Sequence, residues 1–149
     1  MYSSGMLKPD CVKRGLVEEV LSYLEEKGLE IVIKKEVSLN KEDVDVLYGE
    51  LYSTAEFYPG LCESMMSGKA VFYVVRSENA IDLLNDLVGS TEPTKAADYT
   101  VRRKYGTNIR ENVIHSTENE RTFRLETNHF LSREEKKLLR KKDVSFQQN

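Results

Sequence analysis

The strongest secondary-structure signal in the sequence is the segment Lys69–Arg76, where six consecutive apolar residues lie between two basic ends. Side chains on a strand alternate between its two faces, so an unbroken apolar run predicts a strand that is buried on both. We therefore expect this segment to lie in the centre of a β-sheet. The run is too short for a membrane-spanning helix, which needs roughly 20 apolar residues.

The segments before this strand alternate between helical and extended patterns. Pro9 opens a predicted helix whose apolar residues recur at helical spacing as far as Gly28, where the helix is expected to end. In residues 29–37 apolar and polar side chains then alternate, which predicts a strand with one buried face. Asn40 is placed to cap a second helix through Asp43.

After the central strand, helical and extended patterns alternate again. Ser77 is expected to cap a third helix that ends at Gly89, and a short helix is expected at residues 100–105. Asn112-Val113-Ile114-His115 is predicted to be a short strand. Including a first strand before Lys8, the order of elements predicts an α/β (α+β) fold. We expect a ferredoxin-like βαββαβ sandwich, in which helices pack on a single antiparallel sheet.

Two Ser/Thr-x-x-Glu sequences have the spacing of a helix capping box, Thr117 with Glu120 and Ser132 with Glu135. The second opens a charged terminal segment, residues 132–149, with six basic and three acidic side chains. The whole chain has a net charge of −3, so residues 1–131 carry −6. We expect one domain at residues 1–131 and a charged helical extension at residues 132–149.

The composition excludes several classes of function. An acidic body opposes general nucleic-acid binding, in which a basic face supplies most of the affinity. The two cysteines, Cys11 and Cys62, form no disulfide framework and no Cys-x-x-Cys motif. No basic segment followed by an apolar stretch opens the chain, so we expect no secretory signal and a cytoplasmic, membrane-free protein.

The chain has two histidines, His115 and His129. A lone histidine is more often structural than catalytic, and His129, near a predicted helix end, is interpreted as structural. His115 ends a predicted strand, where side chains commonly face a cleft, so it is a candidate base, ligand or nucleophile. Zinc-ligand spacings, the Gly-x-Ser-x-Gly motif of serine hydrolases and the phosphate-binding P-loop motif are all missing from the sequence.

Several ordered motifs carry a resemblance to a known family. Lys8-Pro9-Asp10-Cys11-Val12-Lys13-Arg14-Gly15-Leu16 is similar to the KPDxVxRGL sequence of nucleoside diphosphate kinases. Asn112-Val113-Ile114-His115-Ser116-Thr117-Glu118 resembles the family's N-[IV]-[IVA]-H-G-S-D motif. Phe57-Tyr58-Pro59-Gly60-Leu61, Met66-Ser67-Gly68 and Gly89-Ser90-Thr91-Glu92-Pro93 lie between them in the family's order. The resemblance covers nearly the whole chain apart from the charged extension.

The resemblance implies a nucleophile, His115, that accepts the γ-phosphoryl group of one nucleoside triphosphate and passes it to a second nucleoside diphosphate. The resemblance implies substrates such as ATP, GTP and GDP, and Mg²⁺ on their phosphates. It also implies a homo-oligomer, usually a hexamer and sometimes a tetramer. It also assigns helper roles. Glu126 would fix the histidine tautomer, Tyr48 and Thr117 would lie beside the nucleophile, and the nucleotide would be bound by Lys8, Phe57, Thr91, Arg102 and Asn112.

Among the positions that depart from the family's pattern, two matter most. Asn85 stands where the family usually has a second phosphate-binding arginine, and Ser116 replaces the glycine after the histidine. If that backbone position needs a positive φ, serine there is strained. These departures leave an alternative open, a weak or inactive family member that binds nucleotides or acts as a scaffold. A ferredoxin-like regulatory or nucleic-acid-binding domain is disfavoured by the acidic body.

Overall fold

The computed structural model describes residues 1–148, with the side chains of residues 1–140. Four antiparallel strands form one sheet in the order β2-β3-β1-β4. The strands are β1 (Tyr2–Leu7), β2 (Glu30–Ser38), β3 (Lys69–Arg76) and β4 (Ile114–Ser116). The apolar segment predicted to be central, β3, lies between β2 and β1, and the ferredoxin-like fold is confirmed. Asn149, the end of the predicted extension, lies outside the described residues.

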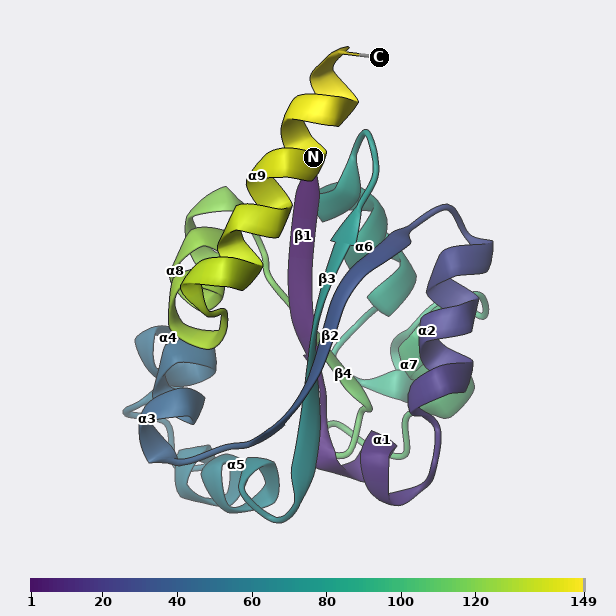
Figure 1. The fold of residues 1–149 in the computed structure, drawn as a ribbon. Coiled ribbons are helices and arrows are strands. Elements are labelled where there is room, and N and C mark those ends of the chain that lie inside the picture. The colour runs from purple at the N-terminus through teal and green to yellow at the C-terminus, as the bar shows by residue number, and fades with distance from the viewer. Residues whose placement is uncertain (149) are drawn as a thin grey trace.

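Helices cover both faces of this sheet (Figure 1). On one side lie α1 (Pro9–Lys13), α2 (Val17–Glu26), α6 (Ala80–Val88) and α7 (Val101–Tyr105). On the other lie α3 (Lys41–Val44), α4 (Glu50–Tyr52), α5 (Tyr58–Met65), α8 (Glu120–Phe130) and α9 (Arg133–Gln148). A π-helical turn, η1 (Asp45–Gly49), joins α3 to α4, and a short 3-10 helix, η2 (Pro93–Lys95), precedes α7. Burial from both sides explains why β3 is apolar on both faces.

β1 is a central strand although its sequence, with Ser3, Ser4 and Gly5, is a poor strand pattern. It pairs with β3 along its whole length and with β4 from Gly5 to Leu7. Ser3 and Ser4 are completely buried. The backbone of β1 therefore gains its ladder from two neighbours, and its small side chains admit larger ones from the adjacent strands.

β2 departs from the predicted alternation. Its pairing with β3 shifts register between Ile31 and Ile33, so the strand has a bulge at this point. As a result Leu29 and Ile31 pack with the core on the α2 and α6 side, whereas Ile33 packs with the core on the α5 and α8 side. The expectation of a single buried face was wrong because a bulge inserts one residue and exchanges the faces.

Helix boundaries follow local side-chain chemistry. Asn40 forms the predicted capping box with Asp43, and Ser132 and Glu135 form the second predicted box before α9. The predicted box at Thr117 was wrong, because Asn119 caps α8 and exchanges hydrogen bonds with Thr122. Asn79, rather than Ser77, is the residue that precedes α6.

The first predicted helix is divided in two. Gly15, with a φ of +69°, lies between α1 and α2 and turns the chain. Such a left-handed conformation is accessible to glycine at little cost. The break lets Lys8 and Asp10 stay at the end of β1 while α2 packs across the sheet. Both residues then lie beside the strand that carries His115.

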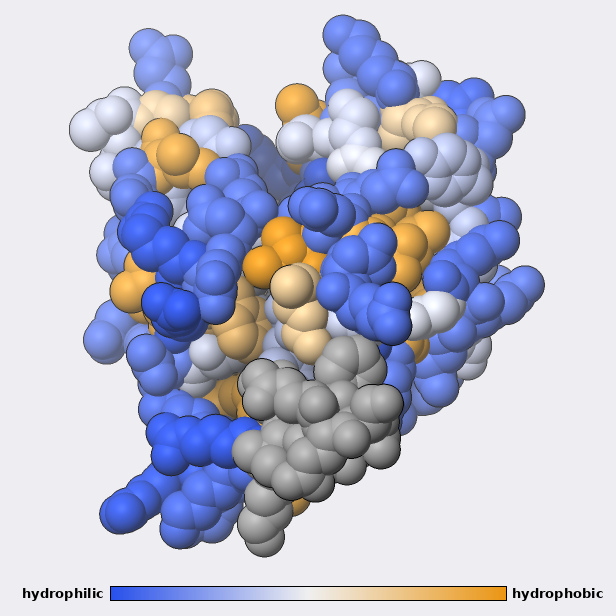
Figure 2. Space-filling model, turned by 90° about the horizontal axis from the view of Figure 1, so that it is seen from above, coloured by the Kyte–Doolittle hydropathy of each residue, from blue (hydrophilic) through white to orange (hydrophobic). Residues whose placement is uncertain are grey.

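The surface agrees with the high charged fraction of 32%. Seen from above, it is mostly hydrophilic, and its hydrophobic residues form separate patches toward the middle of the view (Figure 2). In the described part of the chain no helix combines the length and the apolar character needed to cross a bilayer.

Candidate active site

A cleft of about 760 Å³ opens beside β4 and gathers most of the predicted site residues. Its walls come from the end of β1, from η1 through the start of α5, from the loop after α6, from α7 and from α8. Eight predicted residues line it: Lys8, Tyr48, Phe57, Thr91, Arg102, Asn112, His115 and Glu126. These positions extend from residue 8 to residue 126 of the sequence, so it is the fold that brings them together.

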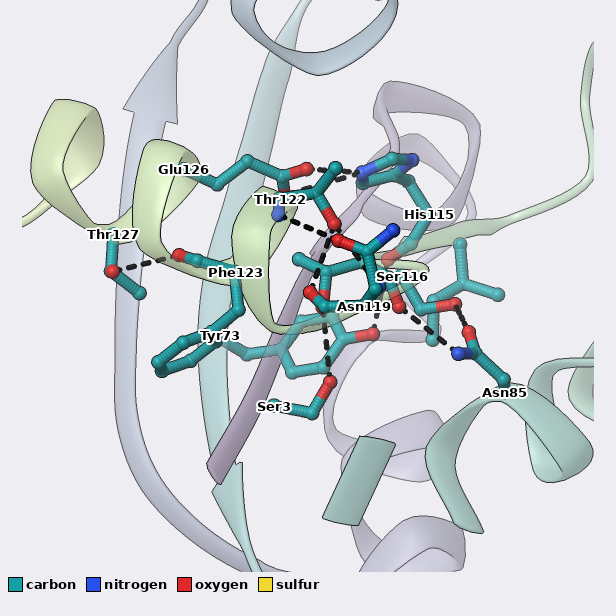
Figure 3. Close-up of polar contacts among 12 residues, drawn as sticks. Ser3, Tyr73, Asn85, His115, Ser116, Asn119, Thr122, Phe123, Glu126 and Thr127 are labelled. Carbon is teal, nitrogen blue, oxygen red and sulfur yellow. Dashed lines mark hydrogen bonds and ion pairs between the residues drawn. The ribbon is translucent and has the colours of Figure 1, made fainter. Parts of the chain in front are cut away.

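His115 lies in the middle of β4 and turns its ring toward α8 (Figure 3). Its Nε2 lies 3.3 Å from both carboxylate oxygens of Glu126, which is almost wholly buried. The ring also meets Tyr48 edge-on, at a centroid distance of 4.9 Å. A carboxylate partner on Nε2 favours the tautomer with the proton on that nitrogen, and leaves the lone pair of Nδ1 for attack.

A strained residue directs this short strand. Val113, two residues before His115, has a φ of +78°, which is unusual for a β-branched side chain. Its N–H donates to Asp10 Oδ2 over 3.1 Å, and its carbonyl accepts from the Lys8 N–H over 2.8 Å. The turn after β1 therefore stabilises the conformation that directs β4. The sequence motif that contains Asp10 does not indicate this role, because the contact joins residues that are 103 positions apart.

Lys8 is a buried cation, with 3% of its surface exposed. Its Nζ donates to the Arg110 carbonyl over 2.7 Å and to Asn112 Oδ1 over 2.9 Å. Burial lowers the pKa of Lys8 to about 8; Asp10 opposes this shift, while Arg102 adds to it. An anionic ligand beside Nζ would relieve this destabilisation of the charged form.

Arg102 is held by backbone oxygens. Its two terminal nitrogens donate to the Gly89 carbonyl over 3.0 Å and to the Ile114 carbonyl over 2.7 Å. Its buried Nε has no partner among the described residues. Burial lowers the pKa of Arg102 from its usual value. The guanidinium thus stabilises the start of β4, while Nε retains an unused donor.

Asn112 organises the loops at the mouth of the cleft. Its side-chain nitrogen donates to the carbonyls of Thr91 and Ile109 over 2.9 and 3.0 Å, while its oxygen accepts from Lys8. Thr91 is exposed at the rim of the cleft. Asn112 and Thr91, two of the predicted nucleotide-binding residues, therefore both lie in the cleft. The hydrogen bonds of Asn112 connect them to Lys8.

Aromatic rings form a row along one wall. Phe57, half exposed, lies 5.3 Å from Tyr52 between ring centroids, and Tyr52 lies 6.4 Å from Tyr48. Burial raises the pKa of Tyr48, so its hydroxyl remains protonated. Tyr52 was missed by sequence reasoning, although its position four residues after Tyr48 on a helical segment predicts a shared face.

Thr117 lies below the cleft rather than in its lining. Its Oγ1 is 3.1 Å from Ser3 Oγ, and its N–H donates to the Ser4 carbonyl over 2.9 Å. In the described structure its hydroxyl makes no hydrogen bond to His115. Thr117 therefore joins the segment after the nucleophile to β1.

Arg110 is a cleft residue that sequence reasoning left without a role. Its guanidinium lies against Gly60, where an added Cβ would be 2.6 Å from Nη1. No carboxylate is paired with it within the described residues. It therefore adds a positive charge beside Lys8 and contributes to the lowering of the Lys8 pKa.

The cleft offers no protein cage for a metal ion. Among the side chains that the structure describes, those of residues 1–140, no group of three or more His, Cys, Asp or Glu is placed to ligate one. A divalent ion such as Mg²⁺ commonly keeps waters and is held largely by substrate phosphates. The donor set therefore fits a metal that arrives on a ligand rather than a resident one.

Comparisons with known proteins agree with this geometry. Residues 3–136 match the family model described as nucleoside diphosphate kinase. A nucleoside diphosphate kinase of Persephonella marina is 36% identical over 128 residues, which is 86% of this chain and 91% of the relative. One from Rickettsia prowazekii is 35% identical over 134 residues, 90% of this chain and 95% of the relative.

Solved structures show the same likeness. A nucleoside diphosphate kinase from Encephalitozoon cuniculi superposes with a TM-score of 0.83 and 30% identity, covering 87% of this chain and 88% of the other. The enzyme from Aquifex aeolicus superposes with a TM-score of 0.83 and 25% identity, covering 90% and 96%.

Proposed function

This chain belongs to the nucleoside diphosphate kinase family, and we propose that it exchanges γ-phosphoryl groups between nucleoside tri- and diphosphates through His115. The observation that carries this proposal is the contact of His115 Nε2 with both oxygens of buried Glu126. Family membership makes the chain a phosphotransferase that acts on nucleotides. The roles of individual residues are inferred from their places in the cleft.

In the first half-reaction His115 Nδ1 attacks the γ-phosphorus of a nucleoside triphosphate. A P–N bond forms, the bond between the γ-phosphorus and the bridging oxygen breaks, and the nucleoside diphosphate leaves. Glu126 stabilises the positive charge that develops on the ring and keeps the proton on Nε2. In the second half-reaction a terminal phosphate oxygen of another diphosphate attacks the same phosphorus. A P–O bond forms, the P–N bond breaks, and His115 leaves in its original form.

The remaining cleft residues bind and orient the nucleotide. Lys8 and Arg102 supply positive charge to the phosphate oxygens, and Thr91 supplies a hydroxyl at the rim. Phe57 presents an exposed ring on which any base can stack, so selectivity among bases is expected to be low. Asn112 would contact the sugar, as the resemblance to the family implies. Tyr48 packs against the nucleophile and limits its rotation.

Mg²⁺ bound to the nucleotide phosphates would neutralise their charge during transfer. We infer a cytoplasmic location and a homo-oligomer, with a hexamer favoured and a tetramer as the alternative. We further infer that residues 1–131 form the catalytic domain and that residues 132–149 are an extension.

Intact mass spectrometry tests the proposal. The protein is incubated with ATP and Mg²⁺, quenched at high pH and compared with His115→Ala and His129→Ala. We expect one acid-labile phosphoryl group on the wild type and on His129→Ala, lost when GDP is added. A folded wild-type protein that gains no phosphoryl group would exclude the kinase reaction and favour a nucleotide-binding or scaffold role.

A further inference from the structure

Tyr73 contacts the backbone of the nucleophile from the face of the sheet opposite its ring. It lies on β3, is completely buried, and its hydroxyl donates to the carbonyl oxygen of His115 over 3.0 Å (Figure 3). Tyr73 packs with the core below α2 and α6, whereas the His115 ring points to Glu126 on α8. The peptide bond that follows His115 is therefore held by a hydrogen bond from the face of the sheet opposite the histidine ring.

Gly5 makes this contact possible. On β1 it is paired with Tyr73 on one side and with Ser116 on the other, so the tyrosine ring must pass over it to reach β4. A Cβ at position 5 would lie 1.9 Å from the His115 carbonyl oxygen and 2.3 Å from the Tyr73 hydroxyl. No side chain fits there without moving the nucleophile. The position of the Tyr73 ring therefore depends on the absence of a side chain at Gly5.

β4 needs such support because it is short and lies at an edge of the sheet. It has three residues and pairs with β1 alone. Its approach passes through Val113, whose positive φ is intrinsically unfavourable. A strand of this kind has little stability of its own, so side-chain hydrogen bonds from neighbouring elements decide where the nucleophile lies.

We propose that Tyr73 is a positioning residue for phosphoryl transfer, whose hydroxyl fixes the His115 carbonyl and so the direction of the His115 ring. The contact acts through the backbone, while Glu126 and Tyr48 restrain the ring itself. Positioning matters because a displacement of about 1 Å at a reacting group can cost about 100-fold in rate. Burial raises the pKa of the Tyr73 hydroxyl far above its ordinary value, so the donor keeps its proton.

Tyr73→Phe tests this inference, which rests on the proposed function of His115. The control is Tyr2→Phe, because the Tyr2 hydroxyl also donates to a backbone carbonyl, that of Leu139, over 2.5 Å. Both variants are unfolded in urea, and rapid-quench experiments measure the rate of phosphohistidine formation from ATP. We expect similar losses of stability, but a decrease in rate of about tenfold for Tyr73→Phe alone, with the nucleotide KM within about twofold of wild type.

A rate for folded Tyr73→Phe equal to that of Tyr2→Phe would overturn the positioning role. A wild type that forms no phosphohistidine would instead overturn the proposed function, so the two failures are distinguishable. Should Tyr73→Phe be too unstable to assay, Tyr73→4-aminophenylalanine keeps a weaker N–H donor at the same place. A rate of phosphohistidine formation below those of the wild type and Tyr2→Phe supports the inference, and an unchanged rate contradicts it.

Discussion

Ser116 Oγ donates a hydrogen bond to Asn85 Oδ1 over 2.7 Å. The same asparagine donates from Nδ2 to the Thr117 carbonyl over 3.1 Å. These two residues stand at two of the positions where the sequence departs from the family's pattern, so these two departures contact each other. Ser116 is not strained, because Val113 is the non-glycine residue with positive φ among those described. Asn85 therefore supplies no charge for phosphate binding. Its side chain instead holds the segment after β4 through hydrogen bonds.

Removing either partner should cost stability. Asn85→Ala leaves the Ser116 hydroxyl and the Thr117 carbonyl without their partner, which we expect to lower the free energy of unfolding by about 1–3 kcal/mol. In a double-mutant cycle with Ser116→Ala, measured by urea unfolding, the coupling energy should be at least about 0.5 kcal/mol. If the two losses of stability are additive, the hydrogen bond between Asn85 and Ser116 makes no contribution of its own.

Restoring the family's residues should strengthen nucleotide binding. Asn85→Arg combined with Ser116→Gly places a cation at the cleft and removes the hydroxyl that now binds position 85. A hydrogen bond to a charged group contributes about 1.5–3 kcal/mol, so the dissociation constant for ADP should fall roughly tenfold or more. Isothermal titration calorimetry measures it. Asn85→Gln, which adds no charge, is the control and should leave affinity unimproved.

Activity should decline as Lys8 loses its proton. Because the pKa of Lys8 is lowered to about 8, the free enzyme loses this cation as the pH rises through that value. We expect kcat/KM for the diphosphate to fall above pH 8, while kcat, measured in the complex, falls at higher pH because bound phosphate raises the pKa. Lys8→Arg should remove the decline up to pH 10, since guanidinium stays charged. A flat kcat/KM profile in the wild type would contradict this account.

Glu126 should affect rate rather than binding. Glu126→Ala removes the acceptor on His115 Nε2, so the ring loses its fixed tautomer and the stabilisation of its developing charge. We expect kcat to fall about 10–100-fold, as for other carboxylates that orient histidines, with little change in KM. Glu126→Gln keeps an acceptor without the charge and should retain more activity than Glu126→Ala. Equal activities for the two variants would assign the effect to the carboxylate charge alone rather than to the acceptor or the packing of the side chain.

Much of the fold follows from the sequence because local patterns and tertiary structure agree. The apolar segment Lys69–Arg76 is the central strand with the predicted bounds. A strand that is buried on both faces is apolar throughout, so its sequence pattern is unambiguous. Asn40 and Ser132 cap helices as predicted because their partners lie three residues away. The bulge in β2 was not predictable, because it depends on the register with β3.

The cleft was predictable to the extent that motifs keep their spacing. Lys8, Asn112 and His115 lie within short signature sequences, and the fold brings them to one place. Contacts that cross between strands were not predictable in this way. Tyr73 reaches His115 only because Gly5 lies between them, and neither residue belongs to a motif. In the sequence Gly5 only weakens the pattern of its own strand.

The positive φ of Val113 has a consequence for how the protein loses function. Its strain is offset only while Asp10 and Lys8 are docked against it. The end of β1 and the approach to β4 should therefore open together, as one cooperative unit, before the rest of the sheet melts. Mild denaturant should then abolish phosphorylation of His115 while most of the helical signal persists. The loss of catalytic activity and the loss of folded structure can therefore be measured separately in this protein.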